Sequence, residues 1–506
     1  MNSYEEIDCY LRACFPILYI ETFEEQRAYP ILVEWAKSLN YEIIEHNSRG
    51  LFFPAENKKT INDLASALKN FIEQPTNSGI DFNLNKKILI IKDNEKTLDT
   101  TAVCGALKFI AEAIMSDEDE LDARIVILSP VVSIPKELEH LITLISFEHP
   151  SDIEIANIIK NFCDEQKIDI TESLNNELKT ALKGMPAFDI RNTLALAYIP
   201  SGKLTKESLN IIYEQKKQII KKSGIMDMID THDSFYEDIG GLENIKHYLE
   251  RKRTIFQNLE KAKAFGIEPP KGLLIAGLPG CGKSLTAKAT ASLFRIPLLR
   301  LDMGRLMGKY VGESEANLRR ALQIAEAIAP CVLWVDELEK AFSGVGGHGA
   351  NAELTTRLMG NFLTWMQEKN SLVFVIATVN DISGIPPELL RKGRFDELFY
   401  VDLPNEDERK TILSIHIRKR RPQDLDHLDI DALARDMEGF SGADIEGVVK
   451  DALEECFYQK LDRLEERALS DAMTLAHPLK ETMSEEIDAM LEEYKKRQFK
   501  NASEGC

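Results

Sequence analysis

The sequence predicts an α/β fold in which a parallel sheet covered by helices is built twice along the chain. Short apolar runs alternate with longer segments of helical periodicity in both halves, which is typical of parallel sheets with helices on both faces. The 506 residues also exceed the roughly 250–300 at which a single hydrophobic core stops growing. Two α/β domains are therefore expected.

The apolar runs give the strands of each predicted domain in order. The spacing between Ile17 and Leu273 nearly equals that between Gly184 and Gly439, so matching landmarks recur at an almost constant distance. This regularity favours two copies of one domain, and two unrelated α/β domains remain the alternative. The first sheet is expected at 17–20, 41–45, 87–91, 124–128 and 144–147, and the second at 273–276, 297–301, 332–335, 372–377 and 398–401.

The composition limits which binding partners and which cellular compartment are expected. A formal net charge of −21 disfavours binding to nucleic acid or anionic membranes, so neither partner is expected and a protein client is preferred. No apolar run reaches the roughly 18 residues that span a bilayer, and the acidic N-terminus resembles no signal or transit peptide, which predicts a cytoplasmic protein. The eight cysteines show no zinc-type spacing and are expected to be reduced thiols.

Residues 277–284 read GLPGCGKS and match the phosphate-binding pattern GxxxxGK[ST], with a strand-like run before and a helical pattern after. The glycines let successive backbone N–H groups converge on phosphate oxygens at a helix N-terminus. Lys283 is expected to place its charge on the β- and γ-phosphates of ATP, and Ser284 to offer a hydroxyl to Mg²⁺. The residues expected to contact the nucleotide here are Gly277, Leu278, Pro279, Gly280, Cys281, Gly282, Lys283, Ser284 and Leu285.

The matching position of the first half has lost this chemistry. Residues 21–28 read ETFEEQRA, without a glycine and with three carboxylates that would repel phosphate. In the second half, a strand ends in the acid pair Asp336-Glu337. The matching position of the first half reads Lys92-Asp93-Asn94. We therefore expect residues 1–225 not to hydrolyse ATP.

Two carboxylates follow a buried strand about fifty residues after the phosphate loop. Asp336 is expected to hold Mg²⁺ through water, and Glu337 to polarise the attacking water. Asn380, after the next strand, is expected to orient that water, although an Asn after a strand is often only a turn residue.

Two arginines, Arg391 and Arg394, flank a glycine further along the chain. An arginine supplied by a neighbouring subunit stabilises charge on the transferring phosphoryl group. The alternative is a solvated basic turn. The neighbouring motifs favour the catalytic interpretation.

Taken in order, the segments GLPGCGKS, VLWVDE, ATVND, ELLRKGRFD and GFSGADIE resemble the AAA family of ring-forming ATPases over residues 234–457. The resemblance implies a P-loop NTPase AAA+ module, which is a parallel sheet plus a helical lid, preceded by a degenerate AAA-like α/β domain. It implies ATP and Mg²⁺ as cofactors and a homo-oligomer, a hexamer, in which the arginines reach a neighbour. It also implies that Asp238, Ile239 and Gly240 pack on adenine, and that His416, Gly442 and Ala443 contact the nucleotide from the lid.

The resulting domain boundaries are a degenerate domain at 1–225, an ATPase sheet subdomain at 226–403, a lid at 404–480 and a C-terminal helical tail at 481–506. Within the first domain the sheet is expected at 1–148 and the lid at 149–222. The lysine-rich segment 214–224 is the expected linker, and 484–500 is expected to be a solvated helix.

A finer resemblance is to the chloroplast and cyanobacterial hypothetical-reading-frame AAA proteins. It is carried by phrases such as APCVLWVDELEKAF, FLTWMQEK and NDISGIPPELLRKGRFDELFYVDLP, and by a chain of this length with a degenerate first copy. This resemblance sharpens the architecture more than the biological role.

The segment after the second strand of the ATPase domain indicates whether ATP turnover could move a polypeptide. Lys309, Tyr310 and Val311 lie where AAA unfoldases project an aromatic side chain into a central pore, so Tyr310 is expected to grip a polypeptide, although a packed tyrosine is the alternative. The glycine-rich stretch 343–351 is expected to be a second pore loop.

The leading hypothesis is therefore an ATP-hydrolysing protein remodeller. The alternatives are a nucleotide-gated regulatory or scaffold protein that threads no polypeptide, and, with less support, a nucleic-acid motor. Cys281 adds the hypothesis that thiol modification silences the site.

Overall fold

The structure is a computed structural model in which the chain divides into two compact units. The first unit is Met1–Thr180 with Met185–Ser208, and the second is Ala181–Gly184 with Leu209–Cys506. The residues described are 3–22, 24–54, 58–60, 63–72, 75–76, 79–80, 84–92, 97–116, 121–130, 132–147, 149–231, 236–306, 313–342, 350–382, 385–391 and 393–503.

The first unit contains a seven-stranded sheet in the order β4-β3-β2-β7-β8-β1-β9, of which β2, β7, β8, β1 and β9 run parallel. All five strands predicted for the first half are present. The strands are β1 (Ile17–Glu21), β2 (Glu42–Asn47), β3 (Gly50–Phe53), β4 (Lys58–Thr60), β7 (Lys87–Lys92), β8 (Ala123–Ser129) and β9 (Ile142–Ser146), with a small hairpin of β5 (Pro75–Thr76) and β6 (Gly79–Ile80).

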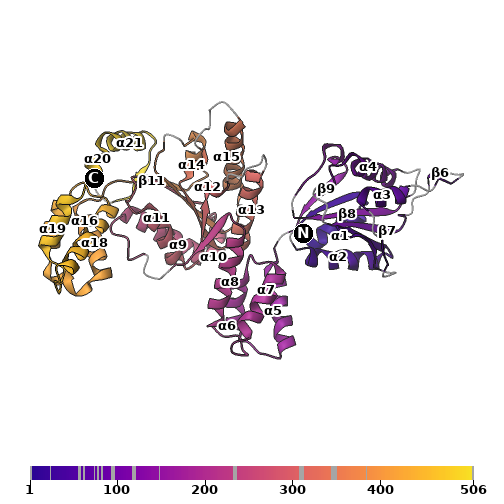
Figure 1. The fold of residues 1–506 in the computed structure, drawn as a ribbon, viewed down its shortest axis with the longest axis horizontal. Helices are drawn as coiled ribbons and strands as arrows, with labels where there is room; N and C mark the ends of the chain where they lie inside the picture. Colours follow the sequence, from indigo (N-terminus) through magenta and orange to yellow (C-terminus); the bar gives the residue numbers. More distant parts are fainter. Residues whose placement is uncertain are drawn as a thin grey trace. The chain divides into compact units, whose positions relative to one another are not determined.

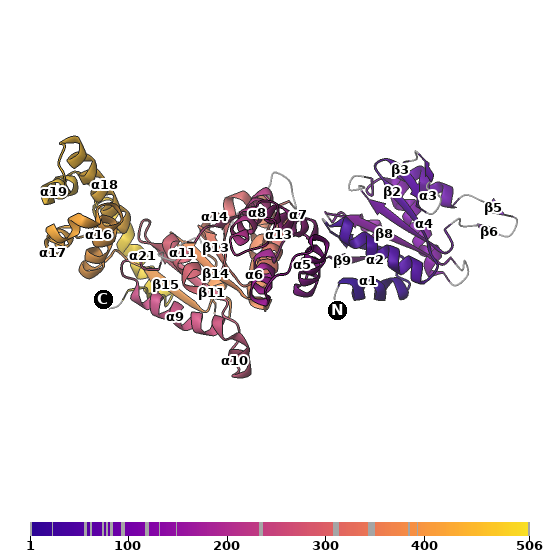
Figure 2. The same ribbon diagram turned by 90° about the horizontal axis from the view of Figure 1, so that it is seen from below.

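Helices cover both faces of this sheet, because its strands are apolar on both sides. Figure 2 shows α1 (Ser3–Arg12) and α2 (Glu25–Ser38) on one face and α3 (Leu64–Ile72) and α4 (Thr101–Met115) on the other. Helices α5 (Asp152–Gln166), α6 (Glu172–Leu182) and α7 (Ala187–Tyr198) follow η1 (Lys136–Leu138) and β9.

The second unit contains another seven-stranded sheet, in the order β10-β12-β13-β14-β11-β15-β16. Its five central strands, from β12 to β15, run parallel and match β2-β7-β8-β1-β9 strand for strand in chain order. This shared order supports the predicted repeat. The strands are β10 (Met226–Ile229), β11 (Gly272–Gly277), β12 (Leu298–Asp302), β13 (Cys331–Asp336), β14 (Val373–Val379), β15 (Glu397–Val401) and β16 (Lys500–Asn501).

The helices of this sheet again occupy both faces (Figure 1). One core packs α9 and α11 against the strands, and the other packs α13 and α15. The bounds are α9 (Glu243–Gln257), α10 (Leu259–Ala264), α11 (Lys283–Phe294), α12 (Met303–Leu306), α13 (Glu313–Ile328), α14 (Leu338–Phe342), α15 (Ala350–Glu368) and η3 (Pro387–Leu390).

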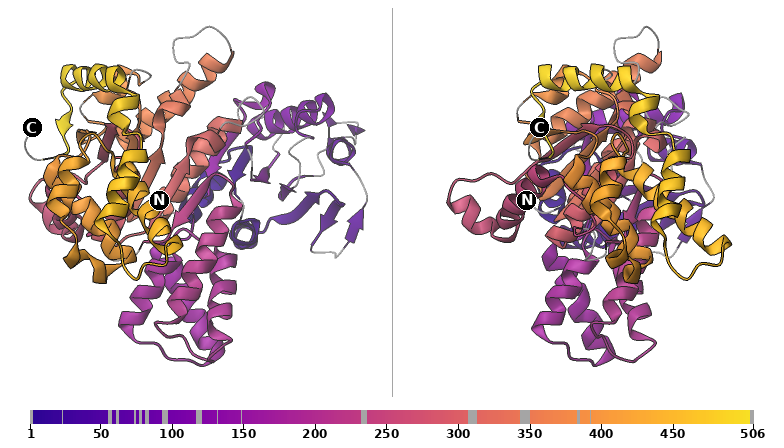
Figure 3. Two further views of the ribbon diagram at one scale, coloured as in Figure 1. Left: turned by 60° about the vertical axis from the view of Figure 1, so that its left-hand side comes forward. Right: turned by 90° about the vertical axis from the view of Figure 1, so that its left-hand side faces the viewer.

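A bundle of helices after β15 forms a core of its own, the lid, which is drawn in orange and yellow in Figure 3. Among the described helices of the chain, none is both long and apolar enough to cross a membrane. The lid consists of α16 (Glu406–Arg420), η4 (Pro422–His427), α17 (Ile430–Asp436), α18 (Gly442–Tyr458) and α19 (Glu466–Leu475), and α20 (Leu479–Thr482) and α21 (Ser484–Lys496) follow it.

The C-terminal segment differs from the expected solvated helix. Tyr494 of α21 is only 1% exposed and stacks on Tyr400 of β15 with ring centroids 5.6 Å apart. Residues 500–501 then add β16 to the edge of the sheet, parallel to β15. The charge pattern correctly indicated an exposed side of α21, but it could not reveal that the other side belongs to the core.

The segment expected to be a linker is also ordered. It forms α8 (Ser208–Lys222), and β10 then pairs antiparallel with β12. Lys216 of α8 is 1% exposed, and its ammonium group donates to the carbonyl oxygen of Ala181 at 3.0 Å. Burial lowers the pKa of Lys216 to about 7. The lysines of the expected linker therefore belong to an ordered helix and do not mark a flexible connection.

Candidate nucleotide site

The phosphate loop connects β11 to α11, as the sequence predicted. Gly277, Gly280 and Gly282 all have positive φ, at 149°, 77° and 89°, which residues with side chains rarely adopt. A Cβ on Gly280 would lie 2.9 Å from the Cβ of Ala443 and from the hydroxyl oxygen of Ser441, so the lid leaves no room for a side chain there. The conformation and packing of the loop therefore fit a backbone cradle for phosphate.

Lys283 begins α11 and is 7% exposed. Its ammonium group donates to the carbonyl oxygens of Gly277 and Leu278, both at 2.7 Å, so it lies over the loop that would hold phosphate. Burial lowers the pKa of Lys283 to about 8. Ser284, the predicted Mg²⁺ ligand, is exposed at the start of the same helix.

Cys281 is 8% exposed and belongs to an apolar core, with its thiol 3.8 Å from the carbonyl oxygen of Pro279. Burial raises the pKa of this thiol to about 12, which keeps it protonated and weakly nucleophilic at neutral pH. This environment argues against the hypothesis that the site is readily silenced by thiol reagents.

A cavity of about 350 Å³ lies beside the phosphate loop, between the sheet and the lid of the second unit. This volume lies in the range of small-molecule sites. Ten of the residues predicted to contact the nucleotide line it: Asp238, Ile239, Gly240, Gly280, Cys281, Gly282, Leu285, His416, Gly442 and Ala443.

Close backbone approaches shape this cavity. A Cβ on Gly240 would lie 2.9 Å from the backbone nitrogen of Ile412, so the segment around Gly240 runs against α16. The N–H of Ala443, at the start of α18, donates to the carbonyl oxygen of Gly280 at 3.1 Å. The lid therefore contacts the phosphate loop directly.

Charged residues from the lid border the same cavity, and the sequence did not identify them. Lys419 of α16 forms an ion pair with Asp238 at 2.8 Å, and Arg420 forms one with Glu446 at 2.7 Å. Burial lowers the pKa of His416, and the positive charges of Arg420 and Lys419 lower it further, which favours the neutral imidazole.

The predicted acid pair lies at the end of β13. Asp336 accepts a hydrogen bond from the hydroxyl of Thr378 on β14 and forms an ion pair with Arg300 on β12, both at 2.8 Å. Glu337 follows with a positive φ of 49°, a strained conformation of the kind that gathers at functional sites. Its carboxylate is 2.6 Å from the ammonium group of Lys340 and is 41% exposed.

Asn380 lies next to this pair. Its backbone N–H donates to one carboxylate oxygen of Glu339 on α14, at 3.1 Å. The second carboxylate oxygen of Glu339 is buried and has no hydrogen-bond partner among the described residues. Burial raises the pKa of Glu339. Glu339 thus fixes the backbone at Asn380, a role that its unremarkable place in the sequence did not indicate.

The arginines lie apart from the cavity. Neither Arg391 nor Arg394 is among its lining residues, and Arg391 is exposed. Arg394 donates to the carbonyl oxygen of Glu388 in η3. The predicted pore residues Lys309, Tyr310 and Val311, the acidic-strand position of the first copy at Asp93 and Asn94, and most of the second glycine-rich loop lie outside the described residues.

Comparisons with known proteins agree with this architecture. Residues 273–403 match the family model described as "ATPase family associated with various cellular activities (AAA)", and 427–471 match an "AAA+ lid domain". Residues 3–147 and 153–223 match the "N-terminal domain" and "second domain" of a "SpoVK-like AAA ATPase".

Proteins described as "Uncharacterized AAA domain-containing protein ycf46" are similar over most of their length. The protein from Guillardia theta is 34% identical over 90% of this chain and 88% of its own. The protein from Pyropia yezoensis is 34% identical over 91% of both chains. The chain belongs to the AAA ATPase family. The two resemblances identified from the sequence are confirmed.

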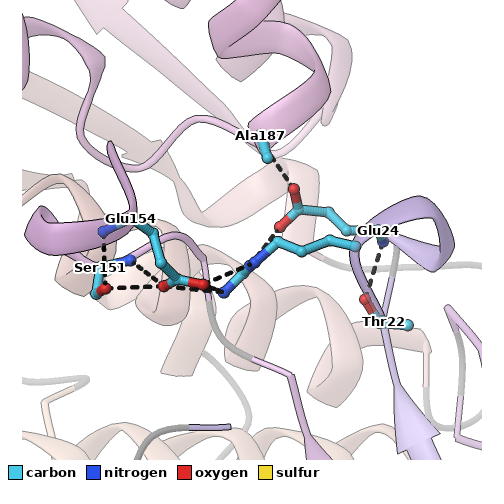
Figure 4. A network of polar contacts seen from close by, with 6 residues as sticks. Thr22, Glu24, Ser151, Glu154 and Ala187 are labelled. Atoms are coloured by element: carbon cyan, nitrogen blue, oxygen red, sulfur yellow. Dashed lines mark hydrogen bonds and ion pairs between the residues drawn. The ribbon is translucent and has the colours of Figure 1, made fainter. Parts of the chain in front are cut away.

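The first AAA copy has a polar network where the second has its phosphate loop (Figure 4). The carboxylate of Glu24, just after β1, accepts a hydrogen bond from the N–H of Ala187 at the start of α7. It also pairs with Arg27 at 2.9 Å, and Arg27 pairs with Glu154 of α5 at 3.1 Å. Burial raises the pKa of Glu24, although the Ala187 N–H and Arg27 oppose this shift.

This network occupies the position that corresponds to the phosphate loop of the second copy. Counted from the ends of β1 and β11, Glu24 matches Gly280 and Arg27 matches Lys283. In the second copy, the N-terminus of lid helix α18 donates to the carbonyl oxygen of Gly280. In the first copy, the N-terminus of the matching helix α7 donates to the carboxylate of Glu24. A carboxylate at this point would repel phosphate, which is consistent with the prediction that the first copy does not hydrolyse ATP.

Proposed function

We propose that this AAA protein hydrolyses ATP at a single site per chain, in the second copy, and that a ring of chains uses the turnover to remodel a protein client. The observation that carries the proposal is the convergence of the phosphate loop, the acid pair and the lid cavity within one unit. The matching residues 21–28 of the first copy contain no glycine and three carboxylates.

Each residue of the site would have a defined task. The backbone cradle and Lys283 bind the phosphates, and Lys283 exchanges its two carbonyl acceptors for phosphate oxygens. Ser284 and Asp336 offer the oxygen atoms that Mg²⁺ prefers, and bound Mg²⁺ supplies positive charge that offsets the phosphate charge. Glu337 polarises the attacking water, and Asn380 orients it.

Substitution of Glu337 tests the catalytic assignment. Glu337→Gln should bind ATP while hydrolysing it at least about 100-fold more slowly, because the amide is a far weaker base. The matched control is Glu237→Gln, the same change at an exposed carboxylate that does not line the cavity. Wild-type turnover in Glu337→Gln would refute the assignment.

The position of Arg391 and Arg394 supports a site shared between chains, most simply in a hexamer. Arg391→Ala should bind nucleotide and lose activity as a homomer. In a mixture with Glu337→Gln chains, which carry intact arginines, part of the turnover should return. A protein that stays monomeric with ATP at every concentration would contradict the ring.

The remodelling role depends on Tyr310, which a further variant addresses. Tyr310→Ala should lose client remodelling while retaining ATPase activity if the chain grips polypeptide. Retention of both would favour the nucleotide-gated scaffold instead. The acidic composition supports a protein client. As a separate proposal, the protein acts in the cytoplasm.

A further inference from the structure

Arg300 is a residue of the second copy that the proposed mechanism does not use, although it contacts the Mg²⁺-facing carboxylate. It lies on β12, in register with Trp334 on β13. Its guanidinium carbon is 5.0 Å from the centroid of the Trp334 ring, and one of its terminal nitrogens donates to Oδ2 of Asp336 at 2.8 Å.

The two oxygens of Asp336 have different partners. Oδ1 accepts from the neutral hydroxyl of Thr378, while Oδ2 faces the cation of Arg300. Thr378 also accepts the backbone N–H of Glu337 at 3.3 Å, so it fixes the orientation of the acid pair on the β14 side. Asp336 would therefore remain oriented without Arg300, which contributes mainly a positive charge.

Arg300 is not tightly bound by other groups. Its Nε is buried and has no hydrogen-bond partner among the described residues. Stacking on Trp334 and the ion pair with Asp336 are the contacts that hold the guanidinium. A cation held in this way offsets the charge of Asp336 and repels a second cation that approaches the same carboxylate.

We infer that Arg300 shares Asp336 with Mg²⁺ and thereby sets the Mg²⁺ concentration at which the site binds nucleotide. This inference rests on the proposed function, since it assumes a Mg²⁺-dependent nucleotide site. Arg300 is a positioning and tuning residue that acts through Asp336. Its charge keeps the affinity for the divalent ion low until nucleotide phosphates contribute their own negative charge.

The test measures binding of a non-hydrolysable ATP analogue to the full chain over a range of Mg²⁺ concentrations, by calorimetry or by thermal shift, without turnover. Arg300→Gln should lower the half-saturating Mg²⁺ concentration at least about threefold, because a repelling charge is removed. Arg300→Lys keeps the charge and should stay within about twofold of the wild type. Arg300→Met keeps the apolar stem over Trp334 and should behave like Arg300→Gln, which provides a second neutral variant if one fails to fold.

The matched control is Arg305→Gln on α12, which removes the same charge. Arg305 pairs with Asp227 and Asp302 rather than with Asp336. It should leave the half-saturating Mg²⁺ concentration unchanged. An unchanged or raised concentration in folded neutral variants of Arg300 would overturn the inference alone. A wild-type chain that binds the analogue equally with and without Mg²⁺ would also overturn the inference alone, whereas a chain that binds no analogue at any Mg²⁺ concentration would overturn the proposed function and the inference together.

Discussion

The two AAA copies share the order of their five parallel strands and differ where the first strand of each ends. In the second copy, β11 runs into a glycine loop whose carbonyl at Gly280 meets the N-terminus of lid helix α18. In the first, β1 runs into an acidic turn, and the carboxylate of Glu24 meets the N-terminus of lid helix α7. The same junction of sheet and lid is therefore closed by the backbone in one copy and by a side chain in the other.

In the first copy, a carboxylate takes the place that the carbonyl of Gly280 has in the second. A helix N-terminus carries unsatisfied N–H groups and a partial positive charge that favour an anion. Glu24 supplies the anion permanently, and Arg27 and Glu154 extend the contact to α5. The equivalent helix of the second copy, α16, has the same type of capping box, with Asn405 and Glu408 in place of Ser151 and Glu154.

The largest expected effect separates the two copies by nucleotide binding. Lys283→Ala should weaken ATP binding at least about 100-fold, because it removes a charged contact with the phosphates. Arg27→Ala alters the matching position of the first copy and should leave the affinity unchanged. Calorimetric titration of both variants measures this, and a loss of affinity in Arg27→Ala would place a nucleotide site in the first copy.

A smaller effect is expected from removing the carboxylate of the first copy. Glu24→Ala should destabilise the first unit by about 1.5–3 kcal/mol, the usual contribution of a hydrogen bond to a charged group. Hydrogen exchange at the start of α7 should accelerate, while ATP binding by the second copy persists. Glu34→Ala, at an exposed position of α2, is the control. Equal exchange in the two variants would show that Glu24 does not hold the lid helix.

The smallest expected effect is a pH dependence confined to the second copy. Burial lowers the pKa of Lys283 to about 8, whereas bound phosphate would stabilise its charged form. Above this pH, nucleotide binding must take up a proton, so the affinity should fall by up to about tenfold per pH unit. Titrations from pH 7 to 9.5 in buffers of different ionisation enthalpy measure both the affinity and the proton uptake. Constant affinity across this range would exclude Lys283 as the titrating contact.

Much of this protein could be predicted because its signals are local. The alternation of apolar runs predicted the five parallel strands of each sheet, since a buried parallel strand is apolar on both faces. The phosphate loop was identified because its conformation requires glycine at fixed positions. The cavity then brought together segments around Asp238, Gly280, His416 and Gly442 that the family resemblance had named separately.

Other features had no local signal. The partners in the Glu24–Ala187 hydrogen bond are 163 residues apart, and those in the Arg300–Asp336 ion pair are 36 apart. Nothing in a run of residues indicates which distant group a carboxylate will meet. The charge pattern of residues 484–500 likewise suggested a solvated helix, because the buried residues Ile487, Tyr494 and Phe499 are too few to outweigh the charges as a signal of docking.

The sequence by itself determined the repeated α/β architecture, the phosphate loop and the acid pair, because each follows from the periodicity or the conformational demands of consecutive residues. Only the tertiary structure decided which charges face one another: Glu24 at the lid helix of the first copy, and Arg300 at the acid pair of the second. The physical reason is that ion pairs and hydrogen bonds between side chains depend on distance in space, which is set when sheets and helices pack.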